Sequence, residues 1–480
     1  SPDTYMTNFI TADICVIGAG SAGLSVASGA AQMGARTVLI EAHKMGGDCL
    51  NTGCVPSKAL LAAAKSAHGV RASARYGIET GDPSTKFETV NTYVHNVIGT
   101  IAPHDSVERF TGLGCTVIQA HAKFIDERTV IAGDTTIRAR RFVIATGSQP
   151  NIPPIPGLTD VPYFTNETIF QNTSLPEHLI IVGAGPIGCE MAQAHRRLGS
   201  RVTLLDIGRM LPKDDPDAVA VVYQKLIAEG IECAELVKDL RVEKTPGGLS
   251  AIVSVDGKER RIAGSHLLLA TGRKPNIQGL DLEKAAIRYT PKGIEVDSRL
   301  RTSNRRVFGA GDVIGGYQFT HMANYHAGII IRNALFRLPA KNAPAAVPWV
   351  TYTDPELAQV GPTEAEARTS LGDSIRVLRA DFSGNDRAQA EASTEGFIKV
   401  ITGKRGRIIG ATIVGPHAGE LMMPWVLAIT TGMKIGDIAG LIFPYPTLSE
   451  ISKRAAGSYY TPTLFSSRTR AIVRFLGAFG

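Results

Sequence analysis

Two copies of one local pattern constrain this 480-residue sequence more than any other feature. In each copy an apolar run leads into G-x-G-x-x-G, then a helix-forming stretch, then a second apolar run ending in an acid. The glycines and the acid are Gly18, Gly20, Gly23 and Glu41 in the first copy, and Gly183, Gly185, Gly188 and Asp206 in the second. A strand, a glycine-rich turn, a helix and a strand with a closing acid form a dinucleotide-binding βαβ unit. The sequence therefore predicts an α/β fold with two Rossmann-like dinucleotide-binding domains.

A cysteine pair follows the first copy, within residues 46–58, which read GGDCLNTGCVPSK. Pro56 opens a run rich in Ala and Leu, so Cys54 should stand next to a helix N-terminus, where a thiolate is favoured. Gly53 allows the tight turn that two bridged sulfurs need. The alternatives are two unrelated thiols or half a zinc site, but the other cysteines are scattered singly. We interpret Cys49 and Cys54 as a redox-active disulfide.

The same stretch resembles the signature of the flavin-dependent pyridine nucleotide–disulfide oxidoreductases, which include dihydrolipoamide dehydrogenase, glutathione reductase and mercuric reductase. The resemblance covers about residues 10–460. It implies that Cys49 is the outer, substrate-facing sulfur and Cys54 the inner one, next to the flavin. It also implies that Lys58 lies beside the flavin and pairs with Glu190.

The order of the motifs assigns the cofactors. The first fingerprint, followed by the cysteine pair, should hold FAD, and the second should hold the nicotinamide cofactor. Asp206 favours NAD, because a carboxylate repels a 2′-phosphate. Arg209 leaves NADP as an alternative, since an arginine can receive that phosphate.

Two Ala-Thr-Gly strands, ending in Gly147 and Gly272, resemble the family's crossings between the two nucleotide domains. Residues 307–312 resemble its second FAD motif, which makes Asp312 a cofactor residue. We therefore expect a discontinuous FAD domain over 9–150 and 275–342, with an NAD(P) domain over 151–274 between its two parts. An α+β dimerisation domain over 346–462 and a basic amphipathic tail over 463–480 should follow.

The family pattern breaks in the dimerisation domain. Most members carry His-Pro-Thr-x-x-Glu there, whereas this sequence has Tyr445 in place of the histidine and keeps Glu450. Phenol titrates near 10 and imidazole near 6.5, so tyrosine is a poor general base at neutral pH. Phe-Pro-Tyr is similar to mercuric reductase, in which that tyrosine borders the metal site. Mercuric reductase also relays its ion through a C-terminal cysteine pair, and no cysteine follows Cys233 here.

Composition limits the partners. The excess of 51 basic over 44 acidic residues gives a net charge of +7, a mild excess that makes no case for nucleic acid. Few cysteines, no expected signal peptide and no long apolar run favour a cytoplasmic protein. The tail interleaves Arg468, Arg470 and Arg474 with apolar residues, so it predicts either peripheral membrane contact or packing on its own dimer.

These features predict a homodimeric enzyme that passes electrons from NADH through FAD and the Cys49–Cys54 disulfide to an acceptor. That acceptor is a thiophilic metal ion, a disulfide, a quinone or another small electrophile, and we expect no resident metal. Tyr445 and Glu450 should come from the other subunit. The alternatives are dihydrolipoamide dehydrogenase and, from another class, a membrane- or partner-docked flavoprotein for nucleotide sensing or electron transfer.

Overall fold

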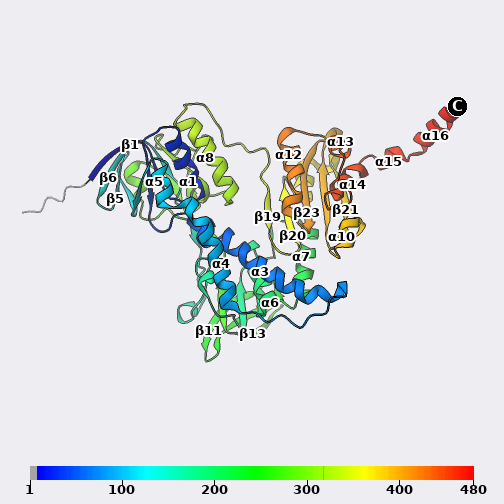
Figure 1. The fold of residues 1–480 in the computed structure, drawn as a ribbon, viewed down its shortest axis with the longest axis horizontal. Coiled ribbons are helices and arrows are strands. Elements are labelled where there is room, and N and C mark those ends of the chain that lie inside the picture. Colours follow the sequence, from blue (N-terminus) through cyan, green and yellow to red (C-terminus); the bar gives the residue numbers. More distant parts are fainter. Residues whose placement is uncertain (1–7, 317) are drawn as a thin grey trace, which may run out of the picture. The chain divides into compact units, whose positions relative to one another are not determined.

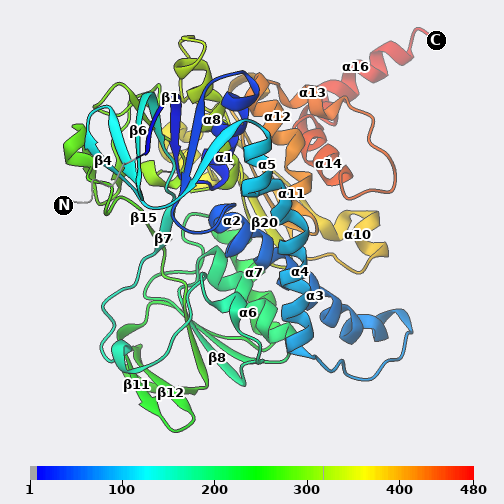
Figure 2. The same cartoon turned by 60° about the vertical axis from the view of Figure 1, so that its left-hand side comes forward.

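The computed structural model describes residues 8–316 and 318–480, which divide into two compact units. The first unit contains residues 8–183, 194–205 and 237–343, and the second contains 184–193, 206–236 and 344–480. Each unit is described by itself below (Figures 1 and 2).

The first unit is built on a largely parallel sheet. Its strand order is β3-β2-β1-β6-β5-β4, and β18 pairs with β6. The strands are β1 (Asn8–Ile17), β2 (Thr37–Glu41), β3 (Cys115–Gln119), β4 (Ala122–Asp126), β5 (Thr129–Ala132), β6 (Thr135–Ile144) and β18 (Val307–Gly309). The central parallel strands, such as β2 and β18, are buried on both faces, as expected for parallel strands covered on both sides.

Helices α1 (Ser21–Gln32) and α8 (Thr320–Ala334) pack side by side on one face of this sheet (Figure 1). Small residues at the contact, such as Ala27 and Ala327, let the two helices approach closely. Helix α2 (Gly47–Asn51) and the long helix α3 (Cys54–Ala72) follow β2, and α4 (Phe87–Ile101) and α5 (Val107–Gly112) lead to β3.

A second parallel sheet repeats the first pattern. Strand β8 (His178–Val182) leads to α6 (Pro186–Leu198) and then to β9 (Arg201–Leu205), and β8 pairs in parallel with β9 and β14 (His266–Leu269). An antiparallel ribbon of β11 (Lys238–Thr245), β12 (Gly248–Val255) and β13 (Lys258–Gly264) precedes β14. Two short strands directly follow the Ala-Thr-Gly segments that were predicted to cross between the nucleotide domains. They are β7 (Ser148–Pro150) and β15 (Arg273–Pro275), and they pair antiparallel.

The second unit contains a five-stranded antiparallel sheet in the order β19-β20-β23-β22-β21. These strands are β19 (Trp349–Thr351), β20 (Glu356–Val360), β21 (Arg376–Asp381), β22 (Phe397–Thr402) and β23 (Ile408–Gly415). The helices are α7 (Pro216–Ala228), α9 (Glu364–Leu371), α10 (Asp386–Ala390), α11 (Ala418–Leu421), α12 (Met423–Thr431), α13 (Ile435–Ala439), α14 (Glu450–Ser458), α15 (Thr461–Leu464) and α16 (Ser467–Gly477).

One predicted helix differs in detail from the structure. The sequence favours a single helix over 421–431, whereas the structure ends α11 at Leu421 and starts α12 at Met423. Pro424 lies in the first turn of α12 and has no N–H to continue the earlier helix, which explains the break.

The tail forms a helix that the rest of its unit does not cover. Helix α16 has no buried residue and extends away from the sheet in both views (Figures 1 and 2). No helix among residues 8–316 and 318–480 combines the length and apolar character needed to cross a bilayer.

Candidate active site

The two cysteines lie at the junction of two helices. Helix α2 contains Cys49, and α3 begins at Cys54 with Gly53 as its N-cap. This helix start confirms the predicted position of Cys54. No side chain caps α3 and no acid lies in its first turn, so its positive end is available to a thiolate. The thiols contact each other, because a hydrogen bond from Cys54 is the main cause that raises the pKa of Cys49, followed by burial.

Three helix N-termini surround this pair. Ser21 begins α1 and Thr320 begins α8, and the hydroxyl groups of both hydrogen-bond toward Cys49 and oppose the rise of its pKa. The Oγ1 of Thr320 also lies 3.9 Å from the Sγ of Cys54. With α3 itself, three helix dipoles point positive ends at the sulfurs, an arrangement that stabilises the negative charge of a reduced pair.

The cysteine helix rests on the first fingerprint. The Cα of Gly20 lies 2.7 Å from where a Cβ on Gly47 would stand, so no larger residue fits at position 47. The N–H of Gly46 also donates to the carbonyl of Ala19 at 2.9 Å. The sequence thus places the predicted disulfide directly against the predicted cofactor loop.

The two fingerprints share one backbone geometry. Gly18 and Gly183 have φ values of +108° and +112°, and a Cβ on either would meet the carbonyl oxygen of Ala145 or Ala270 within about 2 Å. Each first glycine therefore closes on one of the Ala-Thr-Gly segments. These were predicted to end strands, but the structure ends β6 at Ile144 and β14 at Leu269, just before them. The correspondence supports the duplication inferred from the sequence.

The closing acids also correspond. In the first copy Ala19 N–H donates to Glu41 Oε2 at 2.6 Å, and in the second Ala184 N–H donates to Asp206 Oδ2 at 2.6 Å. The other oxygen of each acid accepts a second backbone N–H, from His43 or Gly208. A carboxylate offers about four acceptor sites, so each acid retains capacity for ribose hydroxyls.

Asp312 lies in a polar network that the sequence did not reveal. The hydroxyl of Ser148, the residue after Gly147, donates to Asp312 Oδ2 at 2.6 Å. Arg273, the residue after Gly272, donates through Nε to the same hydroxyl at 2.8 Å. The two predicted crossings therefore meet at the predicted flavin residue.

Lys58 and Glu190 each make a polar contact near their own position in the fold. Lys58 Nζ donates to Ser57 Oγ at 3.2 Å, and the buried Glu190 accepts from the backbone N–H of Tyr352 at 3.3 Å. Their mutual pairing beside the flavin stays a prediction.

Tyr445 has a partner that sequence reasoning missed. Its hydroxyl donates to Asp386 Oδ2 at 2.7 Å, and this bond raises the pKa of Tyr445. Glu450 instead accepts the backbone N–H of Thr447 at 3.1 Å. Tyr445, Asp386 and Glu450 line a hollow of about 230 Å³ together with Asp381 and Arg454. Tyr445 is therefore an even poorer base than an ordinary phenol.

His326 is buried and accepts the N–H of Gly311 through Nδ1 at 3.1 Å. Burial lowers its pKa. This contact is typical of a histidine with a packing role.

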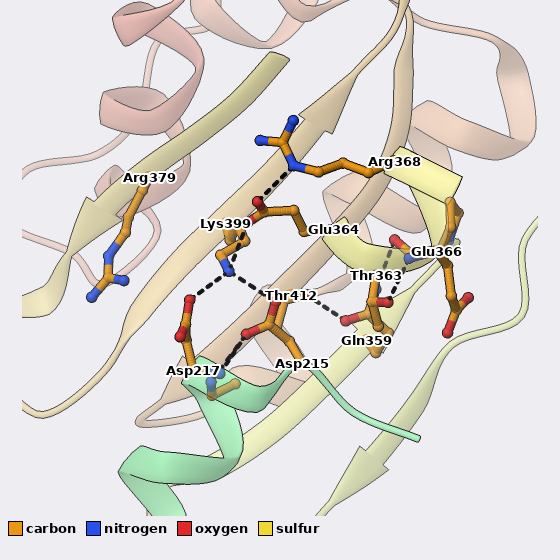
Figure 3. Close-up of polar contacts among 12 residues, drawn as sticks. Asp215, Asp217, Gln359, Thr363, Glu364, Glu366, Arg368, Arg379, Lys399 and Thr412 are labelled. Atoms are coloured by element: carbon orange, nitrogen blue, oxygen red, sulfur yellow. Dashed lines mark hydrogen bonds and ion pairs between the residues drawn. The ribbon is translucent and has the colours of Figure 1, made fainter. Parts of the chain in front are cut away.

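A buried lysine lies within the second unit (Figure 3). Lys399 Nζ lies 2.8 Å from Asp215, 2.9 Å from Asp217 and 3.1 Å from Glu364, and the side chains of Lys399 and Asp215 are only 4% and 2% exposed. Asp215 also caps α7, which follows the Asp206 loop. The cluster therefore ties α7 to strand β22 of the antiparallel sheet.

Lys399→Met should lower the free energy of unfolding by about 3 kcal/mol or more, because it leaves Asp215 buried without a counter-charge. Arg368→Met is the matched control: it removes an exposed partner of Glu364 and should cost less than about 1 kcal/mol. Urea unfolding followed by circular dichroism measures both. Equal losses in the two variants would contradict a special role for the buried lysine.

The comparisons with known proteins agree with this geometry. Residues 12–327 match the model of the pyridine nucleotide-disulphide oxidoreductases, and residues 347–456 match the dimerisation domain of the same family. The chain belongs to this family. A mercuric reductase of Streptomyces lividans is 33% identical over 455 residues, which cover 93% of this chain and 96% of that protein. A dihydrolipoyl dehydrogenase of Thermus scotoductus is also 33% identical, with 93% and 97% covered.

Among solved structures, the HOCl-induced flavoprotein disulfide reductase RclA from Escherichia coli is similar, with a TM-score of 0.83 and 27% identity. The similarity covers 93% of this chain and 99% of that one. The predicted fold class is confirmed: two nucleotide-binding domains and a dimerisation domain of a pyridine nucleotide–disulfide oxidoreductase. The chain is an FAD-dependent enzyme with NAD(P)H as electron donor.

The first fingerprint fits the FAD expected of a pyridine nucleotide–disulfide oxidoreductase. Helix α1 begins after Gly20 with no side-chain cap and no acid in its first turn, which leaves its N–H groups available to a pyrophosphate. Glu41 and Asp312 supply acceptors for hydroxyl groups. When bound, FAD would supply two-electron transfer from the nicotinamide.

Proposed function

We propose that this oxidoreductase uses NADH to reduce a Cys49–Cys54 disulfide, and that the reduced pair passes two electrons to a thiophilic acceptor, as in mercuric reductase. The observation that carries the proposal is the contact between the two thiols where the positive ends of α1, α3 and α8 meet. Such surroundings lower the cost of holding a thiolate.

The electrons and protons balance in two steps. NADH gives up two electrons and one proton as a hydride, and the electron pair, passed by way of FAD, breaks the S–S bond. One sulfur takes a proton and the other remains a thiolate or takes a second proton from water. Oxidation of the pair by the acceptor restores the disulfide and releases those protons.

The acceptor is inferred from the sulfur pair and from Tyr445. Paired thiolates are soft ligands that suit Hg(II) and copper ions. A disulfide acceptor needs an acid that protonates its leaving thiolate, and the phenol of Tyr445, whose pKa is raised by its hydrogen bond to Asp386, is a poor proton donor near neutral pH. Several curated relatives are mercuric reductases, and one similar structure is titled a Cu(II) complex of RclA, with a TM-score of 0.81 and 27% identity.

Steady-state NADH oxidation with Hg(II), Cu(II), lipoamide, glutathione disulfide and a quinone tests this proposal. We expect a metal ion to give the highest kcat/KM. A dominant rate with lipoamide would instead identify the chain as a dihydrolipoamide dehydrogenase.

NADH should be preferred to NADPH by about tenfold or more in kcat/KM, because repulsion between two negative charges near a protein surface has an energy of that size. Asp206 should repel a 2′-phosphate, and Arg209 is paired with Glu235 at 3.4 Å. Glu235→Gln frees Arg209 and should narrow the preference, which parallel assays with both nucleotides would measure. Faster turnover with NADPH in the wild type would show that Arg209 outweighs the carboxylate.

The dimerisation domain supports a homodimer. We infer that Tyr445 and Glu450 of one copy complete the sulfur site of the other. A fully active monomer in analytical ultracentrifugation would contradict this arrangement.

A second proposal concerns the tail, which we infer to bind anionic membrane surfaces. Helix α16 is uncovered and combines three arginines with exposed Ile472, Val473, Phe475 and Leu476, and the exposed Phe479 follows it. Basic charge beside an apolar face matches anionic lipid. Sedimentation with phosphatidylglycerol vesicles, lost when residues 467–480 are deleted, would support this. Equal sedimentation of the truncated chain would contradict it.

A further inference from the structure

Arg273 connects the cysteine helix to the predicted flavin residue. Its Nη2 donates to Asp48, the residue before Cys49, and to the carbonyl of Ser148 at 2.8 Å. Its Nε donates to the Ser148 hydroxyl at 2.8 Å, and that hydroxyl donates to Asp312 at 2.6 Å. A fourth bond, from Nη1 to Asn166 at 3.1 Å, fixes the guanidinium. The result is a continuous chain of polar contacts: Asp48, Arg273, Ser148 and Asp312.

The backbone around this chain holds it in place. Arg273 begins β15, which pairs with β7, so Arg273 and Ser148 stand on two hydrogen-bonded strands. Asp48 lies in the first turn of α2, and Thr52 donates to its other oxygen at 3.4 Å. The Arg273 side chain is only 16% exposed, and fixed charges in such a place act more strongly than surface charges do.

The charges in the network do not cancel. Asp48 contacts the Arg273 guanidinium directly, whereas Asp312 is linked to it only through the Ser148 hydroxyl. Glu167 lies close enough to interact electrostatically with both Asp48 and Arg273. Burial is the main cause that raises the pKa of Asp48, the negative charge of Asp312 adds to it, and Arg273 opposes it. A change at Asp48 or at Arg273 therefore alters the net charge beside the cysteine pair in opposite directions.

We propose that Asp48 and Arg273 are a pair of positioning residues that set the redox equilibrium of the Cys49–Cys54 pair. The inference rests on the proposed function, since it assumes that this pair cycles between disulfide and dithiol. Reduction adds negative charge at the sulfurs. The Asp48 carboxylate opposes that charge and the Arg273 guanidinium favours it, so together they hold the pair at an intermediate potential.

The test is the redox equilibrium of the cysteine pair against a thiol–disulfide buffer, read by alkylation and mass spectrometry of the FAD-bound protein. Asp48→Asn keeps the shape of the side chain and should favour the reduced form, on the order of tenfold in the equilibrium constant. Arg273→Met should disfavour it by a similar factor. Arg273→Lys keeps the charge and should restore most of the wild-type value.

The signs separate an electrostatic role from a structural one. Structural damage would shift the redox equilibrium constant of Asp48→Asn and of Arg273→Met in the same direction, and Arg273→Lys would not restore the wild-type value. Either result overturns the inference. An Asp48→Asn variant with an unchanged equilibrium constant also overturns it. If Arg273→Met does not fold, the isosteric Asp48→Asn variant still decides the question. A wild-type protein with no reducible Cys49–Cys54 disulfide would overturn the proposed function itself, a separate result.

Discussion

Replacing Cys54 by serine should stop electron transfer to every acceptor while leaving reduction of bound FAD by NADH intact. Serine keeps the start of α3 but cannot form the S–S bond that receives the electrons. Acceptor-dependent turnover should fall on the order of 10³-fold or more, as when other covalent nucleophiles are removed. Steady-state NADH oxidation measures the turnover, and stopped-flow absorbance of the flavin measures the first half-reaction.

Cys115→Ser is the matched control, because Cys115 is buried and its sulfur lies 3.7 Å from the carbonyl of Ala27, away from the pair. It should retain wild-type turnover. Cys49→Ser should also lose turnover but keep a long-wavelength thiolate-to-flavin band, because the inner sulfur remains. A Cys54→Ser variant that keeps this band would show that the two sulfurs have the opposite roles.

Tyr445→His should raise dihydrolipoamide oxidation by about 10²–10⁴-fold, the usual contribution of a general base. In the wild type the phenol donates to Asp386, and this bond raises the pKa of Tyr445 further from neutrality. Imidazole titrates near neutral pH, and the nearby carboxylates of Asp386 and Glu450 would raise its pKa. The rate should therefore increase with pH through that pKa, because only neutral imidazole accepts a proton.

Tyr445→Phe separates the base from the loss of the hydroxyl group. It removes the bond to Asp386 without adding a base, so it should not raise dihydrolipoamide turnover. Flavin reduction by NADH should be the same in all three proteins. High dihydrolipoamide turnover in the wild type would show that another base acts, with the exposed His417 a stronger candidate than His326, whose Nδ1 is occupied.

The sequence could predict those features of the fold that depend on local backbone geometry. The glycine spacing at Gly18 and Gly183 and the start of α3 at Cys54 depend on neighbours within a few residues. The break before α12 was missed although Pro424 signals it, because the apolar pattern continues through that position.

The long-range polar partners could not be predicted. Asp386 lies 59 residues from Tyr445, Arg273 lies 225 residues from Asp48, and Lys399 lies 184 residues from Asp215. No local sequence motif marks these partners, and only the folded arrangement of helices, loops and strands brings them together. The inferences about substrate specificity, redox equilibrium and stability are based on these three contacts and not on the sequence motifs.

The most direct measurement counts the thiols that NADH creates. The oxidised, FAD-bound protein is mixed anaerobically with one equivalent of NADH, alkylated, and analysed by mass spectrometry of the peptide that contains Cys49 and Cys54. Our account predicts no alkylation of this pair before NADH and alkylation of both cysteines after it. Identical labelling with and without NADH would contradict the claim that the pair accepts the electrons.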